Sequence, residues 1–268
     1  MTQPTAVPVV ALPDDIEATL VLCRHGESTW IVEGRFQGAA DPPLSPVGQR
    51  QAAHLASRLG DRGRIPILPI PSGPPIAIWH SPLARTSATA TPVGAALGVP
   101  LTAQPDLREI GQGAWEGRLV ADILASDGDL LRAWRQAPVG HEAPGGEALV
   151  QAAVRGARAL EHIVDRLAEA SRARGGGDPD RAPVIGYGSA ASSQPWGLVV
   201  GHDGLLRVIV LTLLGLPLER FWTFPFVPAG ISVLEFHRGH AIVRAHNLDE
   251  HLAPLQRPDP TAGREGAL

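Results

Sequence analysis

Four basic side chains that could form an anion site follow three apolar runs of the sequence. They are Arg24, His25, Arg85 and His202. An arginine guanidinium offers a fixed fork of donors that suits a phosphate or a carboxylate, and a neutral histidine ring nitrogen is a nucleophile near pH 7. The formal net charge of the chain is −4, so any attraction for an anion must be local. Two arginines and two histidines brought together would favour an anion such as phosphate.

Three predicted strands must carry these side chains to one place. The apolar runs Ala18–Cys23, Ile76–His80 and Trp196–Gly201 are typical of buried strands, and a basic group follows each. The carboxyl ends of parallel strands share one edge of a sheet, where open α/β sheets place their ligands. We therefore expect the four side chains to converge there. Taken alone, an Arg-His-Gly triplet favours an ordinary strand end with a surface arginine and histidine.

Helical patterns alternate with these strands and predict the layers around the sheet. Helices are expected at Ser45–Leu59, from SPLART to about Leu97, and at Val120–Gln136, Glu147–Arg174 and Gly204–Gly215, with a strand hairpin at Ile231–His237 and Ala241–His246. Ser45 followed by proline is a favourable helix start, and Gly98 is a favourable stop. This order predicts an α/β fold, a three-layer α/β/α sandwich with a mainly parallel central sheet.

A single domain accounts for most of the 268 residues. We expect it at 18–252, between flexible tails at 1–17 and 253–268. The proline- and glycine-rich stretch 61–75 predicts a long surface loop with, at most, a short edge segment, and the small-residue stretch at about 174–195 predicts a mobile insertion.

Composition argues against several classes of partner. The acidic balance gives no general attraction for nucleic acid or for an anionic membrane, and no apolar run approaches the ~20 residues that span a bilayer. The first residues lack a basic start and are interrupted by proline, so they do not resemble a signal peptide. We expect a cytoplasmic protein that acts on a small molecule, with a homodimer as one option for its assembly.

The other residues with reactive side chains are expected to have structural or surface roles. The single cysteine, Cys23, is expected to be a buried hydrophobe, because strand alternation directs it and Arg24 to opposite faces and so weakens a Cys/His nucleophile pair. His237, His240 and His246 lack a convincing zinc spacing, and we expect no metal site. His141 is expected at the surface, with substrate contact as the alternative. The tryptophans Trp30, Trp115, Trp134 and Trp222 are expected to be packing residues.

Seven motifs together resemble those of the histidine phosphatase superfamily, the phosphoglycerate mutase-like family. They are LVLCRHGESTW at Leu20–Trp30 with GRFQG, DPPLSPVGQRQA at Asp41–Ala52, HSPLART at His80–Thr86, LREIGQGAWEG at Leu107–Gly117, PGGE at Pro144–Glu147, VVGHDGLLR at Val199–Arg207 and NLDEHL at Asn247–Leu252. They occur in the family's order and span most of the chain, which makes the combination specific.

The resemblance implies a mechanism and a set of residues. His25 would be the nucleophile that forms a phosphohistidine, and Arg24, Arg85 and His202 would hold the phosphoryl oxygens. Glu109 would protonate the leaving oxygen, with no cofactor and no metal. Physical chemistry agrees, since nearby cations depress a histidine pKa and burial raises that of a carboxylic acid. The weaker alternatives for the donor are Glu116 and Glu147. Glu116 could instead be a structural partner for an arginine.

The resemblance also places residues on the substrate side of the pocket. Ser28, Gln37 and Gly38 match positions that line it. Three residues depart from the family pattern: Ile31 replaces an asparagine that contacts phosphate in mutases, Ala148 replaces the usual serine, and Asp203 replaces asparagine or glycine. The charge of Asp203 could support His202 or limit which substrates enter, and we count it among the substrate-binding residues.

Three functions are compatible with the sequence. The first is a phosphomonoester hydrolase, the second a phosphoglycerate mutase, and the third a non-catalytic protein that binds a phosphorylated ligand on the same fold. Mutases that resemble this family carry a longer insertion with lysine, tyrosine and paired arginines. Here 110–140 is short, lacks lysine and tyrosine and reads GQGAWEG, which favours the phosphatase branch. The full set of catalytic residue types argues against a binding protein.

Overall fold

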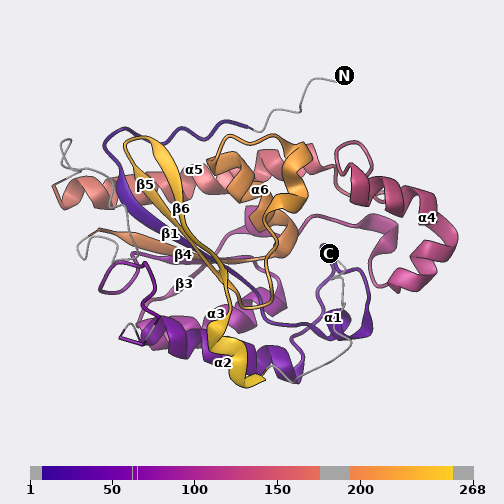
Figure 1. The fold of residues 1–268 in the computed structure, drawn as a ribbon, viewed down its shortest axis with the longest axis horizontal. Helices are drawn as coiled ribbons and strands as arrows, with labels where there is room; N and C mark the ends of the chain where they lie inside the picture. The colour runs from indigo at the N-terminus through magenta and orange to yellow at the C-terminus, as the bar shows by residue number, and fades with distance from the viewer. Residues whose placement is uncertain (1–7, 62, 65, 176–193, 256–268) are drawn as a thin grey trace.

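The computed structural model describes residues 8–61, 63, 64, 66–175 and 194–255, and its centre is a six-stranded sheet (Figure 1). The strands are β1 (Glu17–Arg24), β2 (Ile78–His80), β3 (Leu101–Ala103), β4 (Trp196–Gly201), β5 (Ile231–His237) and β6 (His240–Leu248). Their order is β3-β2-β4-β1-β5-β6. Strands β1 to β4 pair in parallel, and β5 is antiparallel to both of its neighbours. The predicted mainly parallel sheet is therefore confirmed.

Six α-helices surround the sheet in the described part of the chain. They are α1 (Thr29–Glu33), α2 (Pro46–Gly60), α3 (Ala84–Leu97), α4 (Val120–Gln136), α5 (Leu149–Ala173) and α6 (Asp203–Leu213), with 3₁₀ turns η1 (Pro105–Leu107), η2 (Gly113–Trp115), η3 (Leu218–Thr223) and η4 (Glu250–Leu255). The expected caps are present, since the Ser45 hydroxyl accepts the Gly48 N–H and Gly98 ends α3 with a φ of 67°. Glycine adopts that left-handed conformation at little cost.

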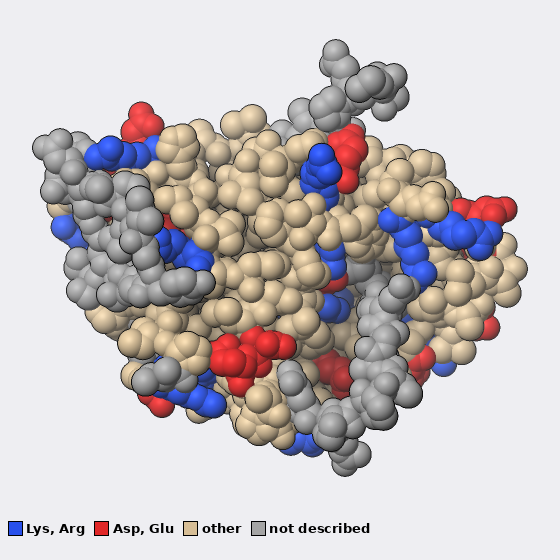
Figure 2. Space-filling model, viewed as in Figure 1, with Lys and Arg blue, Asp and Glu red and all other residues tan. Residues whose placement is uncertain are grey.

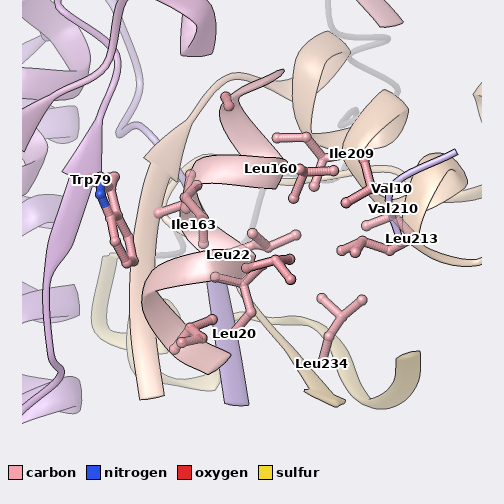
Figure 3. Packing of buried hydrophobic residues seen from close by; sticks show 14 of the residues in the cluster. Val10, Leu20, Leu22, Trp79, Leu160, Ile163, Ile209, Val210, Leu213 and Leu234 are labelled. Atoms are coloured by element: carbon pink, nitrogen blue, oxygen red, sulfur yellow. The ribbon is translucent and has the colours of Figure 1, made fainter. Parts of the chain in front are cut away.

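Each face of the sheet is covered by a pair of helices, which confirms the three-layer sandwich. The even-numbered residues of β1, Leu20 and Leu22, pack with α5 and α6 in one apolar cluster, shown in Figure 3. The odd-numbered residues, Val21 and Cys23, pack with α2 and α3 in a second cluster. Strand alternation thus divides one short apolar run between two cores. A third cluster, rich in aromatic residues, joins α4 to α5 and η3.

The register of the parallel strands aligns the ends that carry the basic residues. Arg24 at the end of β1 lies beside Gly201 at the end of β4, and His80 of β2 lies beside Val200. The backbone N–H of His25 continues the ladder by donating to the Gly201 carbonyl at 2.9 Å. The residues that follow β1, β2 and β4 therefore emerge at one edge of the sheet.

The predicted boundaries need four corrections. The flexible tail at 1–17 is wrong for its later part, because Val10 and Ile16 are buried in the core beside β1. The short elements α1 and β3 were not predicted, since neither is long enough to show a period. In the 61–75 loop, Leu68 and Ile70 are buried against α2 and α3. Ordered structure also continues past 252, through η4. Most of the predicted insertion at 174–195 lies outside the described residues.

Basic and acidic side chains are interspersed on the face of the molecule that Figure 2 shows. Within the part of the chain that the structure describes, no helix combines the length and apolarity needed to cross a bilayer.

Close backbone contact fixes the start of α2 against the loop that follows β1. A Cβ atom added at Gly48 would overlap the carbonyl of Glu27, and one added at Gly26 would lie 2.5 Å from the Gly48 carbonyl oxygen. The Gly26 N–H also donates to Thr89 of α3 at 3.0 Å. Two glycines thus allow the loop around His25 to lie directly on α2.

This contact predicts that Gly48→Ala destabilises the protein by about 1–3 kcal/mol, the usual cost of an added group in a tightly packed place. Gly60→Ala at the other end of α2 is the matched control, because its added methyl group would lie 3.8 Å from the nearest atom. A small stabilisation of about 0.5 kcal/mol is expected there. Urea unfolding followed by circular dichroism measures both, and equal midpoints for the two variants would contradict the prediction.

Candidate active site

His25 lies buried immediately beyond β1 with its ring held in one orientation. Its Nδ1 lies 2.6 Å from the carbonyl oxygen of Gly26. A carbonyl can only accept, so Nδ1 carries the proton in the neutral ring and Nε2 carries the lone pair. Burial, with the charges of Arg85 and Arg24, lowers the pKa of His25 well below its usual value. At neutral pH the side chain is therefore a neutral base with Nε2 available.

Arg85, near the start of α3, is aimed at that nitrogen. Its Nε lies 3.3 Å from His25 Nε2, while Nη1 and Nη2 donate to the carbonyls of Ala40 and Gly38 at 2.7 and 2.9 Å. The side chain is fully buried, and burial lowers its pKa to about 10. It is therefore still a cation at neutral pH, fixed by neutral carbonyl groups.

His202, between β4 and α6, faces His25 across the site. The two ring centroids are 5.1 Å apart with the planes at 63°. His202 Nε2 lies 2.8 Å from the hydroxyl of Ser81, and its Nδ1 is buried with no partner in the described structure. Burial and Arg85 lower the pKa of His202 well below its usual value. The Nε atom of Arg24 is likewise buried without a partner. Buried polar atoms are normally satisfied, so these two nitrogens are candidates for contact with a ligand.

Asp203 organises the arginines behind the site. Its carboxylate accepts two hydrogen bonds from Arg207, at 2.9 and 3.0 Å, and lies 3.8 Å from Arg24 Nη1. It also accepts the N–H of Phe226, whose carbonyl accepts from Arg24 at 2.6 Å. Within the described structure the carboxylate bonds these groups and not His202, so direct support of His202 is not seen, while a limit on which substrates enter stays a prediction. Asp203 acts on the site through Arg24.

Glu109 lies at the amino end of α6. Its carboxylate accepts the backbone N–H groups of Gly204 and Leu205, each at 3.1 Å, and that of Ile110 at 2.9 Å. Burial raises the pKa of Glu109, and the charge of Asp203 adds to the rise against these hydrogen bonds. The side chain is only 6% exposed. Glu109 thus combines a raised proton affinity with donors that can hold its carboxylate form.

The other two acids considered as proton donors have structural partners. Glu116 accepts the N–H groups of Ala39 and Gln112, at 2.8 and 2.9 Å, rather than pairing with an arginine as the sequence suggested. It also fills the space that a side chain at residue 38 would need, which explains Gly38 with its φ of 53°. Glu147 forms an ion pair with Arg155 at 2.6 Å.

The predicted substrate-side residues Ser28, Gln37 and Gly38 are fixed by hydrogen bonds of their own. The Ser28 hydroxyl donates to Gln37 Oε1 at 2.6 Å and caps α1 by accepting the Ile31 N–H at 3.2 Å. Both Ser28 and Gln37 are buried, and Gly38 contributes through the carbonyl that fixes Arg85. The structure thus brings Gly38 to the arginine cradle and leaves Ser28 and Gln37 bonded to each other.

The remaining candidates lie apart from this cluster. Burial raises the pKa of Cys23, which points into the α2–α3 core. His141 Nδ1 hydrogen-bonds the Ala137 carbonyl, and His237 pairs with Glu17 at the opposite end of β1. Within the described residues, no group of three or more metal-ligating side chains lies together. Trp115, Trp134 and Trp222 pack edge to face in the third apolar cluster, as expected for packing residues.

Sequence reasoning missed three residues that support the site. Ser81 holds His202, Thr89 holds the Gly26 N–H, and Arg155 binds the loop that carries Glu109. Ser81 could have been found from its place directly after a predicted strand. Arg155 is eight residues beyond Glu147 on a predicted helix, which is two turns along one face. Thr89 gives no comparable signal.

Comparison with known proteins identifies the family that this chain resembles. The family model of the histidine phosphatase superfamily (branch 1) matches residues 20–171 and 187–249. Phosphoserine phosphatase 1 of Hydrogenobacter thermophilus is 29% identical over 87% of this chain and 93% of its own length. The probable phosphoglycerate mutase GpmB of Yersinia enterocolitica is 28% identical over 73% of this chain and 74% of its own. A mycobacterial glucosyl-3-phosphoglycerate phosphatase, solved with VO3, superposes with a TM-score of 0.68 at 27% identity, covering 86% of this chain and 99% of that one.

The chain belongs to the histidine phosphatase superfamily. Its sheet, helical layers and edge-clustered arginines and histidines are those of an α/β member of branch 1. The resemblance inferred from the ordered motifs is therefore confirmed.

The buried Asp203–Arg207 pair predicts that Asp203→Asn lowers the free energy of unfolding by about 2 kcal/mol, because hydrogen bonds to a buried cation are among the stronger ones. Asp129→Asn is the control, since the Asp129–Arg132 pair is exposed and such pairs contribute at most about 1 kcal/mol. Chemical denaturation compares the two. A loss at residue 203 no greater than that at residue 129 would show that the buried network does not stabilise the fold.

Proposed function

We propose that this protein hydrolyses phosphate monoesters of small metabolites through a phosphohistidine at His25. The observation that carries the proposal is the buried cluster at the sheet edge. There, neutral His25 Nε2 faces Arg85, while Arg24 Nε and His202 Nδ1 have no partner among the described residues. Membership of the histidine phosphatase superfamily supports the same reaction, as do the similar proteins that are named as phosphatases.

The phosphoryl group is bound by the cationic cradle before any bond changes. Arg24 and Arg85 supply fixed guanidinium groups, and His202 supplies a ring N–H when its proton is on Nδ1. Phosphoryl transfer depends mainly on in-line positioning and on neutralising charge at the phosphoryl oxygens. Carbonyl groups and Asp203 already hold the arginines in place, so little reorganisation accompanies binding.

In the first step His25 Nε2 attacks phosphorus, the ester P–O bond breaks, and Glu109 gives its proton to the leaving oxygen. The products are an alcohol, phosphohistidine and the Glu109 carboxylate. In the second step a water molecule attacks phosphorus, Glu109 takes the water proton, and the P–N bond breaks to release phosphate and neutral His25. One carboxyl group thus acts as acid and then as base. The N–H groups of Gly204 and Leu205 stabilise its ionised form between the steps.

The alternative reaction is transfer of the phosphoryl group from His25 to a second hydroxyl, as in a mutase. Residues 110–140 form η2, α4 and short connections, and they contain no lysine or tyrosine. These are the residue types with which mutases that resemble this family clamp a carboxylate. We therefore infer that water is the acceptor. Ser28 and Gln37 are proposed to contact the substrate, whereas Gly38 and Asp203 act through Arg85 and Arg24.

A panel of phosphate esters assayed in EDTA tests the function. We expect inorganic phosphate from at least one small phosphomonoester, and His25→Ala should lower its release by roughly 10⁴-fold or more, as is usual when a nucleophile is removed. His141→Ala is the control, because His141 lies outside the cluster. Phosphohistidine is stable to base and labile to acid, so quenching at each extreme identifies it. Near-normal turnover by folded His25→Ala would refute the mechanism, and isomerised phosphoglycerate without free phosphate would establish the mutase.

Glu109→Gln should affect substrates according to their leaving groups. An alkyl ester leaves as a strongly basic alkoxide, so its turnover should fall by about 10²- to 10⁴-fold without the proton donor. A nitrophenyl ester leaves as a stabilised phenolate and should be slowed far less. Single-turnover rates on both esters measure the difference. Equal losses would assign Glu109 to phosphate binding or to folding instead of proton transfer.

A further inference from the structure

Arg155 of α5 binds η1 and the loop that follows it through several backbone groups at once. Its Nη1 donates to the carbonyls of Asp106 and Arg108 at 2.9 and 2.6 Å, and its Nη2 donates to the carbonyl of Glu109 at 3.1 Å. Asp106 lies in η1, whereas Arg108 and Glu109 follow it in an irregular segment, where their carbonyls have no helix or strand in which to pair. The guanidinium of Arg155 supplies the donors that regular structure would otherwise provide.

Glu147 completes the clamp on the far side of Glu109. Its carboxylate accepts from Arg155 Nε and Nη2 at 2.6 and 2.8 Å, and from the backbone N–H of Gly111 at 3.1 Å. The Glu147 N–H donates back to the Gly111 carbonyl at 2.8 Å. The backbone of Glu109 is thus held on one side by Arg155 and, two residues on, by Glu147. Such bidentate arginine–carboxylate geometry is both strong and directional.

The side chain of Glu109 is fixed by a different helix. Its oxygens accept the first N–H groups of α6, and a Cβ atom at Gly204 would lie 2.7 Å from Oε1. Helices α5 and α6 in turn pack against each other in the apolar cluster of Figure 3, where Leu160 and Ile209 lie together. Glu109 therefore has its backbone bound to α5 and its carboxylate oxygens bound to α6. A shift of the loop would break the contacts with α6.

We propose that Arg155, braced by Glu147, is a positioning residue that keeps the Glu109 carboxyl within reach of the leaving oxygen. The proposal rests on the proposed function, in which Glu109 is the proton donor. No hydrogen bond or ion pair joins Arg155 to the arginine and histidine cradle in the described structure, although its charge adds slightly to the lowering of the His202 pKa. We therefore expect the main effect of Arg155 on proton transfer and a small one on phosphate binding. The side chains of Arg155 and Glu147 are only 12% and 21% exposed, which favours a fixed arrangement.

The leaving-group comparison distinguishes this role from a purely structural one. Arg155→Met should slow single turnover of an alkyl phosphate by about 10²-fold, the cost of a small misplacement in an active site, and a nitrophenyl phosphate by about 3-fold or less. Arg158→Met is the matched control. It lies one turn further along α5 and contacts η1 through Asp106, but 57% of its side chain is exposed. We expect it to leave both rates unchanged. Arg155→Lys should restore part of the alkyl rate.

Variants of Glu109 separate failure of this inference from failure of the function. If Arg155 acts through Glu109, then adding Arg155→Met to Glu109→Gln should cause no further loss on the alkyl ester, which is the non-additivity expected of coupled residues. Selective loss in Glu109→Gln with equal losses on both esters in Arg155→Met would overturn the positioning role alone. Equal losses in Glu109→Gln would overturn the donor assignment itself.

A second variant keeps the test decisive if Arg155→Met does not fold. Glu147→Gln preserves the size of the brace and one acceptor but removes its charge, so it should weaken the hold on Arg155. We expect a selective loss on the alkyl ester of about 10-fold, within the range of such misplacement effects. Its unfolding midpoint shows that the variant is folded. A folded Glu147→Gln enzyme with wild-type rates on both esters would overturn the proposal.

Discussion

Like charges held close together in a buried place set the main physical constraint on this structure. Arg24 and Arg85 are directed to one small region at the sheet edge, and both are at least nine-tenths buried. Burying a cation without compensating groups is costly. The carbonyl oxygens of Phe226, Gly38 and Ala40 accept hydrogen bonds from the two arginines, and nearby carboxylates add compensating charge, that of Asp203 for Arg24 and those of Glu109, Asp41 and Glu116 for Arg85. Because carbonyls are fixed by the fold and carry no net charge, the arginines stay in place while the site remains positive.

The same confinement sets the proton affinities of the neighbouring groups. Burial and the arginine charges lower the pKa values of His25 and His202, and burial raises that of Glu109. All three shifts favour the neutral form of the side chain, which is the general effect of a poorly solvated surrounding. A neutral histidine can attack phosphorus and a neutral carboxylic acid can give up a proton. One environment therefore prepares the nucleophile and the acid together, without a separate device for each.

Much of this arrangement could be predicted from the sequence because the strand ends are marked clearly. The apolar runs before His25 and His202 are short, bounded and β-branched, and Trp196–Gly201 is found with the predicted bounds. Elements of three to five residues, such as β3 and α1, have too few positions to show a period. Val10 could not be placed because its burial depends on a distant helix pair rather than on its neighbours.

The candidate site likewise contains residues that the sequence predicts and residues that it does not. Basic residue types at the strand ends, or shortly after them, predict Arg24, His25, Arg85 and His202. The hydrogen-bond partners of the site residues depend instead on side-chain direction, which the sequence does not give. The role of Asp203 depends on its pairing with Arg207 one helical turn later and with a peptide group 23 residues away. Glu116 bonds backbone amides across a turn that no local pattern specifies. Contacts between irregular segments therefore could not be predicted from the sequence.

The proposed proton donor is anchored in one layer of the molecule, because Glu109 is bound through its backbone to α5 and through its carboxylate to α6, both above the sheet as drawn in Figure 1. Of the two arginines, Arg85 belongs to α3 below the sheet, whereas Arg24 is tied to the start of α6 through Asp203. Substitutions in α5 can therefore change how strongly a departing alcohol is assisted with little effect on these arginines, whereas substitutions at the start of α6 affect both. This separation lets a lineage exchange substrates with easy and difficult leaving groups through changes in a single helix.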